Sequence, residues 1–265
     1  MIGYSNILFA FFLTSVAGLS TGIGSAIALI AKQTNRNFLS LSLGFSAGIM
    51  IYVSFMEMLP TSLAAMTSLF GEKQSTLYLI LAFFAGIAII SGIDFLIPES
   101  VNPHEAHGVE EMNSGVRLKR TGLIVALTIA IHNFPEGIAT FTSALESLDI
   151  AIPITVAIAI HNIPEGIAVA VPIYHSTGSR RKAFWYSFLS GLAEPFGAVI
   201  AYIFLFNFWT PAINSIVLAT VAGIMVFISL DELLPAAEKY GKHHLAIIGV
   251  VAGMAVMACS LLLFV

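Results

Sequence analysis

The decapeptides AIHNFPEGIA (130–139) and AIHNIPEGIA (159–168) are identical at nine of their ten positions. Each copy places His, Asn, Pro and Glu inside an apolar stretch, where polar side chains are costly unless they serve a function. The whole chain is 58% hydrophobic and only 10% charged, with a mean hydropathy of +0.94. Soluble domains carry about 25% charged residues, so this composition predicts a membrane protein.

Apolar stretches long enough to cross a bilayer as a helix, which takes about 20 residues, occur eight times. They do not alternate in polarity, so we expect helices and not a barrel. The predicted spans cover approximately residues 5–31, 39–60, 76–97, 121–145, 150–174, 183–208, 211–237 and 244–265. The chain is therefore predicted to be one all-α transmembrane domain over residues 1–265, with the polar segment 98–120 as a flexible loop.

Basic residues fall almost entirely on one side of this topology. Lys73 is the only one of the eleven Lys and Arg residues in the loops of the opposite side. The other ten lie in the loops after the first, third, fifth and seventh spans: Lys32, Arg36, Arg117, Lys119, Arg120, Arg180, Arg181, Lys182, Lys239 and Lys242. Because Lys and Arg mark cytoplasmic loops, both termini are expected to be extracytoplasmic.

The cytoplasmic loop 98–120 contains several side chains that bind metals in other settings. They are His104, Glu105, His107, Glu110 and Glu111. These residues could hold a metal loosely, but a solvated acidic loop is the favoured explanation. The role of His104 and His107 is left open by the sequence.

A second internal similarity links the second and seventh spans. GIMIYVSFMEMLP (48–60) and GIMVFISLDELLP (223–235) share Gly, Ile, Met, Ser, Glu, Leu and Pro at the same offsets. Chance resemblance of apolar helices does not readily explain a shared Glu and Pro. The second and seventh spans run in opposite directions, as do the fourth and fifth. This predicts an inverted 3+2+3 repeat, which is typical of secondary transporters.

Each decapeptide gathers its polar side chains in one sector of a helix. At about 100° per residue, Glu136 lies between His132 and Asn133, so its carboxylate could share one metal with the imidazole and another with the amide oxygen. The second copy repeats this pattern with His161, Asn162 and Glu165. His132 and His161 each lie about eleven residues into their spans, which are entered from opposite sides. We therefore expect them to meet near the bilayer midplane.

Glu194, in the stretch GLAEPFGA, is a third carboxylate at similar depth in the sixth span. An acid at this depth costs roughly 2.5–3.5 kcal/mol, and no Lys or Arg lies within any predicted span to offset it. Divalent cations are the natural partners. The mixed nitrogen and oxygen ligands suit zinc, iron, cobalt, manganese or cadmium better than calcium or magnesium. The predicted ligands are His132, Asn133, Glu136, His161, Asn162, Glu165 and Glu194.

Small residues follow the decapeptide carboxylates and fill parts of the first two spans. Gly137 and Gly166 would let a neighbouring backbone come close, and Pro135 and Pro164 are expected to kink their helices. The stretches GLSTGIGSA (18–26) and GFSAG (44–48) are predicted to pack against other helices.

Four further acids lie near the ends of predicted spans. We hypothesise that Glu57 collects ions outside, and that Asp94, Asp231 and Glu232 release them inside. Acids that anchor helix ends are a nearly equal alternative.

Three classes of function use buried His and Glu pairs: a metal carrier, an intramembrane metalloenzyme and a membrane metal sensor. No HExxH motif or accompanying nucleophile is present, and the ligands are symmetric about the midplane. A carrier needs access from two sides, so this symmetry favours transport. No nucleotide-binding motif is present either, which favours gradient-driven over ATP-driven movement.

HNFPEGIATF, HNIPEGIAVA and GLAEPFGA resemble the ZIP family of divalent metal transporters, in particular its bacterial ZupT-like branch, and the likeness covers essentially the whole chain. The resemblance implies a multi-pass protein of the cell (inner) membrane that takes up zinc, and also iron, manganese, cobalt and cadmium, as transported substrates. It implies no enzymatic activity, no prosthetic group, no nucleic-acid partner, and a homodimer in the lipid bilayer.

The resemblance also implies a binuclear site on the fourth, fifth and sixth helices. Certain bacterial members carry Asp at the position of Asn162, so the second site is less negative here. One metal would be bound by His132, Glu136, His161 and Glu165, and the second by Asn133, Glu136, Asn162, Glu165 and Glu194.

Overall fold

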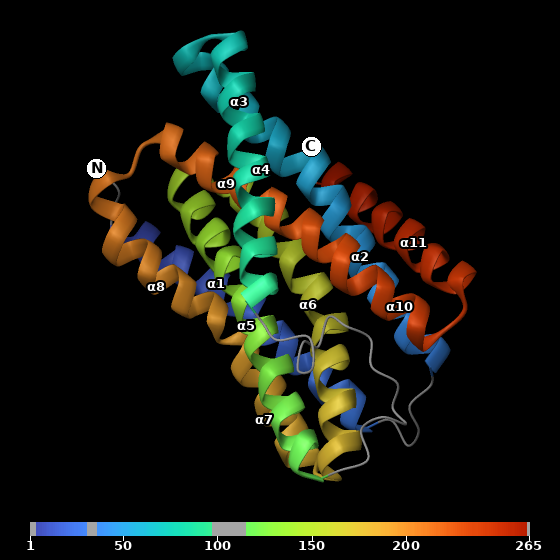
Figure 1. Ribbon diagram of the computed structural model, residues 1–265. Helices are drawn as coiled ribbons and strands as arrows, with labels where there is room; N and C mark the ends of the chain where they lie inside the picture. The colour runs from blue at the N-terminus through green and yellow to red at the C-terminus, as the bar shows by residue number, and fades with distance from the viewer. Residues whose placement is uncertain (1–3, 31–35, 97–114, 264–265) are drawn as a thin grey trace.

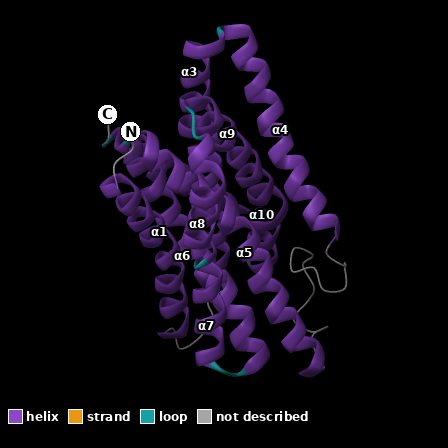
Figure 2. Ribbon diagram, turned by 90° about the vertical axis from the view of Figure 1, so that its left-hand side faces the viewer, coloured by secondary structure: helices purple, strands orange, loops and turns teal. Residues whose placement is uncertain are grey.

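The computed structural model describes residues 4–30, 36–96 and 115–263 (Figure 1). Within these ranges the side chains of residues 28, 30, 36, 96, 115–129, 132, 172, 175, 176 and 240 lie outside the description. The described residues are helical, with short connections and no strand among them (Figure 2). The predicted all-α architecture is therefore confirmed.

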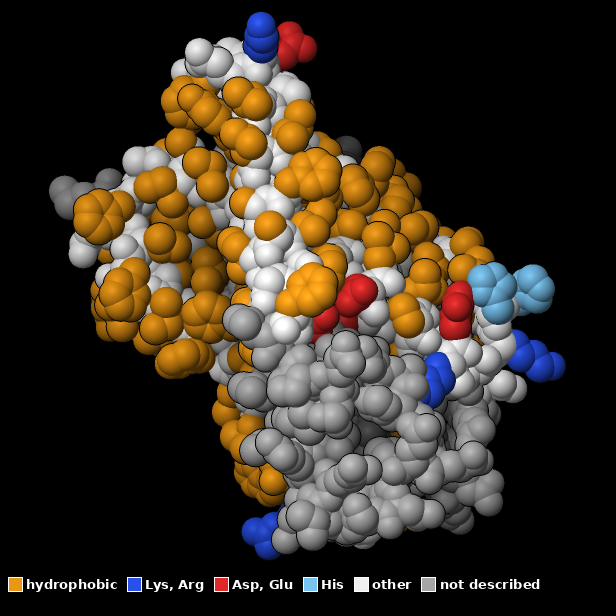
Figure 3. All heavy atoms as spheres, viewed as in Figure 1, with side chains coloured by type: hydrophobic (Ala, Val, Ile, Leu, Met, Phe, Trp, Pro, Cys, Tyr) orange, Lys and Arg blue, Asp and Glu red, His pale blue; other side chains and the backbone are white. Residues whose placement is uncertain are grey.

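Seven helical stretches of the described chain are long and apolar enough to cross a membrane. They are Tyr4–Ile27, Asn37–Phe70, Glu72–Phe95, Leu148–Val171, Arg180–Phe208, Pro211–Lys239 and His243–Leu262. Hydrophobic side chains cover much of the face seen in Figure 3. The protein is a multi-pass helical membrane protein.

The N-terminal part consists of α1 (Tyr4–Ile30), α2 (Arg36–Val53), α3 (Leu59–Phe70) and α4 (Glu72–Leu96), with a π-helical turn η1 (Ser54–Met58) between α2 and α3. The helix that we predicted over 39–60 thus continues to residue 70. Its extension, TSLAAMTSLF, contains no glycine or proline, and the helix ends at Gly71, whose φ of +77° suits glycine. The hairpin of α3 and α4 projects beyond the other helices (Figures 1 and 2).

The two decapeptides lie on α5 (Gly115–Glu146) and α6 (Leu148–Thr177), which continue without a break through Pro135 and Pro164. α5 begins at residue 115, not at 121, because the preceding segment GVRLKR contains good helix formers. The loop predicted over 98–120 is corrected in its last six residues, which are helical. Its remainder, with His104 and His107, lies outside the described residues.

The sixth predicted span is divided into α7 (Arg180–Gly191) and α8 (Ala193–Leu205), followed by a short 3-10 helix η4 (Phe206–Phe208). Pro195 explains the division, because it has no N–H to donate to the carbonyl of Gly191, four residues earlier. The interruption places Glu194 in the first turn of α8. The positive end of a helix dipole favours a carboxylate there.

The C-terminal part consists of α9 (Pro211–Ile228), a π-helical turn η5 (Ser229–Leu233), α10 (Leu234–Tyr240) and α11 (His243–Leu262). The turns η1 and η5 occupy the same offset within the two similar segments found in the sequence. The N–H of Leu59 donates to the carbonyl of Ser54, and the N–H of Leu234 donates to that of Ser229. The two segments therefore share a backbone irregularity as well as residues.

The helices pack as two groups. One group contains α1, α5, α6, α7 and α8, and the other contains α2, α3, α4, α9, α10 and α11; the groups meet where α6 packs on α2 and α5 packs on α9. Glycines bring the helices within each group close together. A Cβ at Gly24 would lie 1.9 Å from the carbonyl oxygen of Ile163 in α6, and one at Gly48 would lie 2.1 Å from that of Val250 in α11. The predicted packing role of both small-residue stretches is confirmed.

Candidate metal centre

Three buried carboxylates come from three different helices of the first group. Glu136 lies in α5, Glu165 in α6 and Glu194 at the start of α8. The glycine after each decapeptide carboxylate allows a close crossing: a Cβ at Gly137 or at Gly166 would stand 2.0 Å from the backbone oxygen of Glu194 or of Thr21, respectively. The predicted role of these two glycines is thereby confirmed.

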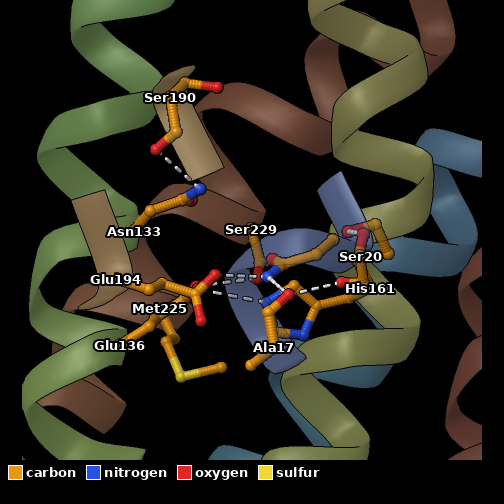
Figure 4. Close-up of polar contacts among 11 residues, drawn as sticks. Ala17, Ser20, Asn133, Glu136, His161, Ser190, Glu194, Met225 and Ser229 are labelled. Atoms are coloured by element: carbon orange, nitrogen blue, oxygen red, sulfur yellow. Dashed lines mark hydrogen bonds and ion pairs between the residues drawn. The ribbon is translucent and has the colours of Figure 1, made fainter. Parts of the chain in front are cut away.

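The acids and their neighbours are almost completely removed from the surface. Glu136 and Glu165 are each 1% exposed, and Glu194 and His161 are 0% exposed. Nε2 of His161 lies 3.3 Å from Oε2 of Glu136, so α5 and α6 are joined by an imidazole–carboxylate contact. Figure 4 shows Glu136, Glu194 and His161 pointing toward one another from their separate helices.

The two decapeptide asparagines donate their amide N–H groups to neighbouring helices. Nδ2 of Asn162 donates to the carbonyl of Ala17 in α1 at 3.0 Å and also to Oε1 of Glu194. Nδ2 of Asn133 donates to the carbonyl of Ser190 in α7 at 3.4 Å. Both amide groups are thereby oriented, which leaves their oxygens free to act as ligands.

Several polar atoms in this group are buried without a hydrogen-bond partner among the described residues. They are Oδ1 of Asn133, Oδ1 of Asn162, Oε1 of Glu136, Oε2 of Glu194 and Nδ1 of His161. Buried polar atoms are rarely left unsatisfied. Glu194 lies close enough to Glu136 and Glu165 for the carboxylates to repel one another when ionised. A cation would satisfy the oxygens and offset the repulsion, so the residues fit a divalent metal chemically.

The side chains are not already arranged as a closed coordination shell. Within the described part of the chain, no three His, Cys, Asp or Glu side chains form a ready metal site. Glu136 is instead paired with His161, and Glu194 with Asn162. His132 lies on α5, but its side chain is outside the described residues. The predicted ligand set therefore remains a prediction.

The four acids of the predicted pathway lie outside the set of buried side chains around Glu136, Glu165 and Glu194. Glu57 is half-buried on η1, while Glu232 is half-buried and Asp231 exposed on η5. Asp94 is half-buried near the end of α4. Glu232 is close enough to Glu165 for their charges to interact.

Backbone atoms near the centre were not predicted from the sequence. The carbonyls of Ala17 and Ser190 hold the two asparagine side chains. Met225 of α9 and Ser229 of η5 lie beside the same group (Figure 4). The stretch GLSTGIGSA indicated that α1 packs closely, but nothing in the side chains indicates which carbonyl accepts a hydrogen bond.

Comparison with known proteins gives a consistent result. The model of the ZIP zinc transporter family matches residues 98–260. A zinc transporter ZupT from Streptococcus mutans is 60% identical, with 97% of each chain covered. A zinc transporter ZupT from Clostridium perfringens is 57% identical over 98% of each chain, and one from Nitratidesulfovibrio vulgaris is 54% identical over 100% of each.

Proposed function

This chain belongs to the ZIP zinc transporter family, and from that premise we propose that it takes up zinc into the cytoplasm as a secondary transporter. Iron, manganese, cobalt and cadmium are proposed as further substrates, because mixed nitrogen and oxygen ligands accept all of them. The members of this family are transporters and not enzymes, so the metalloenzyme alternative is excluded.

The proposal is carried by the three carboxylates that converge, almost fully buried, between α5, α6 and α8. Charged groups in the interior of a membrane protein typically mark an ion pathway. The pairing of Glu136 with His161 and of Glu194 with Asn162 would hold the carboxylates when no ion is bound. An arriving divalent cation would replace these weak contacts by direct coordination.

We propose a binuclear arrangement in which Glu136 and Glu165 are shared. His132 and His161 would complete a nitrogen-rich site, which favours zinc. Asn133, Asn162 and Glu194 would complete an oxygen-rich site. The unpartnered amide oxygens of both asparagines support the second site.

The route on either side of the centre is proposed to use acids at the helix ends. Glu57 would collect ions outside, and Asp94, Asp231 and Glu232 would release them inside. The electrostatic interaction between Glu232 and Glu165 supports a connection from the centre toward η5.

The proposed topology has eight spans in the cell inner membrane. They are the seven stretches given above and α5, which is the fourth span along the chain. Both termini would be extracytoplasmic, since the basic residues then face the cytoplasm. The π-helical turns at equal offsets on α2 and α9 support an inverted 3+2+3 repeat. A homodimer is proposed from the family resemblance, and crosslinking in native membranes would test it.

Zinc uptake by purified protein in liposomes tests the main proposal. Liposomes containing a zinc-sensitive dye should show uptake that needs neither ATP nor another added substrate. The double variant Glu136→Gln/Glu165→Gln should abolish this uptake. A protein that binds zinc but moves none would instead be a metal sensor, and the transport proposal would be wrong.

A further inference from the structure

The far ends of α5 and α9 are joined by a side-chain hydrogen bond. Nδ2 of Asn214 donates to Oε2 of Glu146, the last residue of α5. Asn214 lies near the start of α9 and is 2% exposed, whereas Glu146 is half-buried. Because α5 and α9 belong to different helix groups, this bond connects the two groups at one end of the molecule.

A line of buried polar side chains leads from this bond to the metal centre. Glu136, Thr140 and Ser143 are spaced four and three residues apart, so they share one face of α5. All three are buried. From Glu136 to Glu146 the helix rises by about 15 Å, which is half of the roughly 30 Å hydrocarbon thickness. The line is therefore long enough to connect a midplane site with the membrane surface.

The hydroxyls in this line differ from their neighbours. Thr142 and Thr155 donate to carbonyls of the preceding turn, at 3.2 Å and 2.7 Å. Oγ1 of Thr140 and Oγ of Ser143 are buried and have no partner in the described chain, and neither has Oδ1 of Asn214. Unpartnered buried polar atoms indicate a missing ligand, and here they follow one another along a single helix face.

The other side of α5 is apolar. Phe141 and Leu145 belong to a buried cluster with residues of α1 and α8. Ala139, next to the polar face, belongs instead to the large cluster that includes Leu218 and Ala222 of α9. The polar face is thus on the side where the two helix groups meet.

We infer that the face of α5 carrying Thr140 and Ser143 is the route by which the cation reaches the centre, and that the bond between Glu146 and Asn214 closes this route. The inference rests on the proposed transport function. Hydroxyl and carboxylate oxygens replace water around a divalent cation, so the two hydroxyls serve as passing ligands. Separation of α5 from α9 at Glu146 opens the route to the extracytoplasmic side.

Cysteine accessibility tests this route, because Cys259 is the only cysteine. In a Cys259→Ser background, Ser143→Cys places one thiol on the polar face, and Leu145→Cys places one on the opposite, apolar face. Thr140→Cys provides a second test position. A membrane-impermeant cationic thiol reagent is added outside intact cells, and labelling and zinc uptake are both measured.

We expect labelling at positions 143 and 140, with loss of zinc uptake, and protection by external zinc. Position 145 should remain unlabelled. Addition of Asn214→Ala should speed labelling at position 143 by about tenfold or more, as expected from removal of a hydrogen bond to a charged group.

Equal labelling at positions 143 and 145 would overturn the route, and so would the absence of labelling at both position 143 and position 140. Unchanged labelling in the Asn214→Ala variant would overturn the closing role of the bond. Zinc uptake by the Cys259→Ser protein is measured first, so failure of the transport function is recognised separately from failure of the route.

Discussion

The backbone oxygen of Glu194 lies 2.0 Å from the point that a Cβ on residue 137 would occupy, so this helix crossing requires Gly137. The crossing brings α5 against the start of α8, immediately beside Glu136 and next to the interruption at Leu192. Helix packing and the relative position of Glu136 and Glu194 therefore depend on the same contact. Because glycine carries a hydrogen atom in place of a Cβ, the two backbones can approach closely. This approach sets the separation between the carboxylates of Glu136 and Glu194.

Substitution of Gly137 by alanine should impair both stability and transport. The added methyl group meets rigid backbone, and overpacking of this kind typically costs 1–3 kcal/mol. We expect a lower Tm in detergent and a zinc uptake rate reduced by about tenfold. Gly92→Ala is the matched control, because a Cβ there has nothing within 4 Å. Equal Tm and uptake in the two variants would show that the crossing can relax.

Removal of the charge on Glu194 should weaken zinc binding while the fold is retained. Glu194→Gln keeps the shape of the side chain, and its amide oxygen can still accept from Asn162. We expect Kd for zinc to rise by about tenfold or more, which corresponds to roughly 1.4 kcal/mol. Isothermal titration calorimetry of the purified protein measures this change.

Glu72→Gln removes the same charge from an exposed position on α4 and serves as the control. An unchanged zinc Kd in the Glu194→Gln protein would remove Glu194 from the proposed ligand set.

The repeated decapeptide allowed the central residues to be predicted, because His, Asn and Glu in an apolar helix have few structural uses. The small residues likewise predicted close packing at Gly137 and Gly166. The π-helical turns were not predicted, since Pro60 and Pro235 are equally compatible with an ordinary first helical turn. The backbone acceptors at Ala17 and Ser190 were not predictable either, because every residue carries the same carbonyl group.

The acids of the two π-helical turns should affect different steps of transport. Glu57→Gln should raise the half-saturating zinc concentration, because fewer ions are collected at the outer end. Glu232→Gln should lower the maximal rate, because its charge interacts with Glu165 on the way out of the centre. Initial uptake rates over a range of zinc concentrations separate the two effects. If both variants match Glu72→Gln, these acids only anchor helix ends.

Asn162→Asp should make stability depend more strongly on zinc. In the metal-free variant, the new carboxylate would face the carbonyl of Ala17 and the carboxylate of Glu194. In the parent, these two groups accept hydrogen bonds from the side-chain N–H groups of Asn162. An uncompensated buried charge costs about 3–5 kcal/mol, so the metal-free Tm should fall. Bound zinc offsets the charge, and a ligand that binds the folded state stabilises it by mass action. The difference in Tm with and without zinc should therefore be larger than in the parent.

Asn207→Asp introduces the same charge at an exposed position in η4 and should leave this difference unchanged. A zinc-dependent increase in Tm equal to that of the parent would mean that residue 162 does not contact the ion. A fall in Tm that zinc cannot reverse would assign Asn162 a purely structural role between α1 and α8. The proposed role of residue 162 requires that zinc restores the Tm that the Asn162→Asp variant loses when no metal is bound. An ion bound between residues 162 and 194 would offset the added charge and so restore the stability.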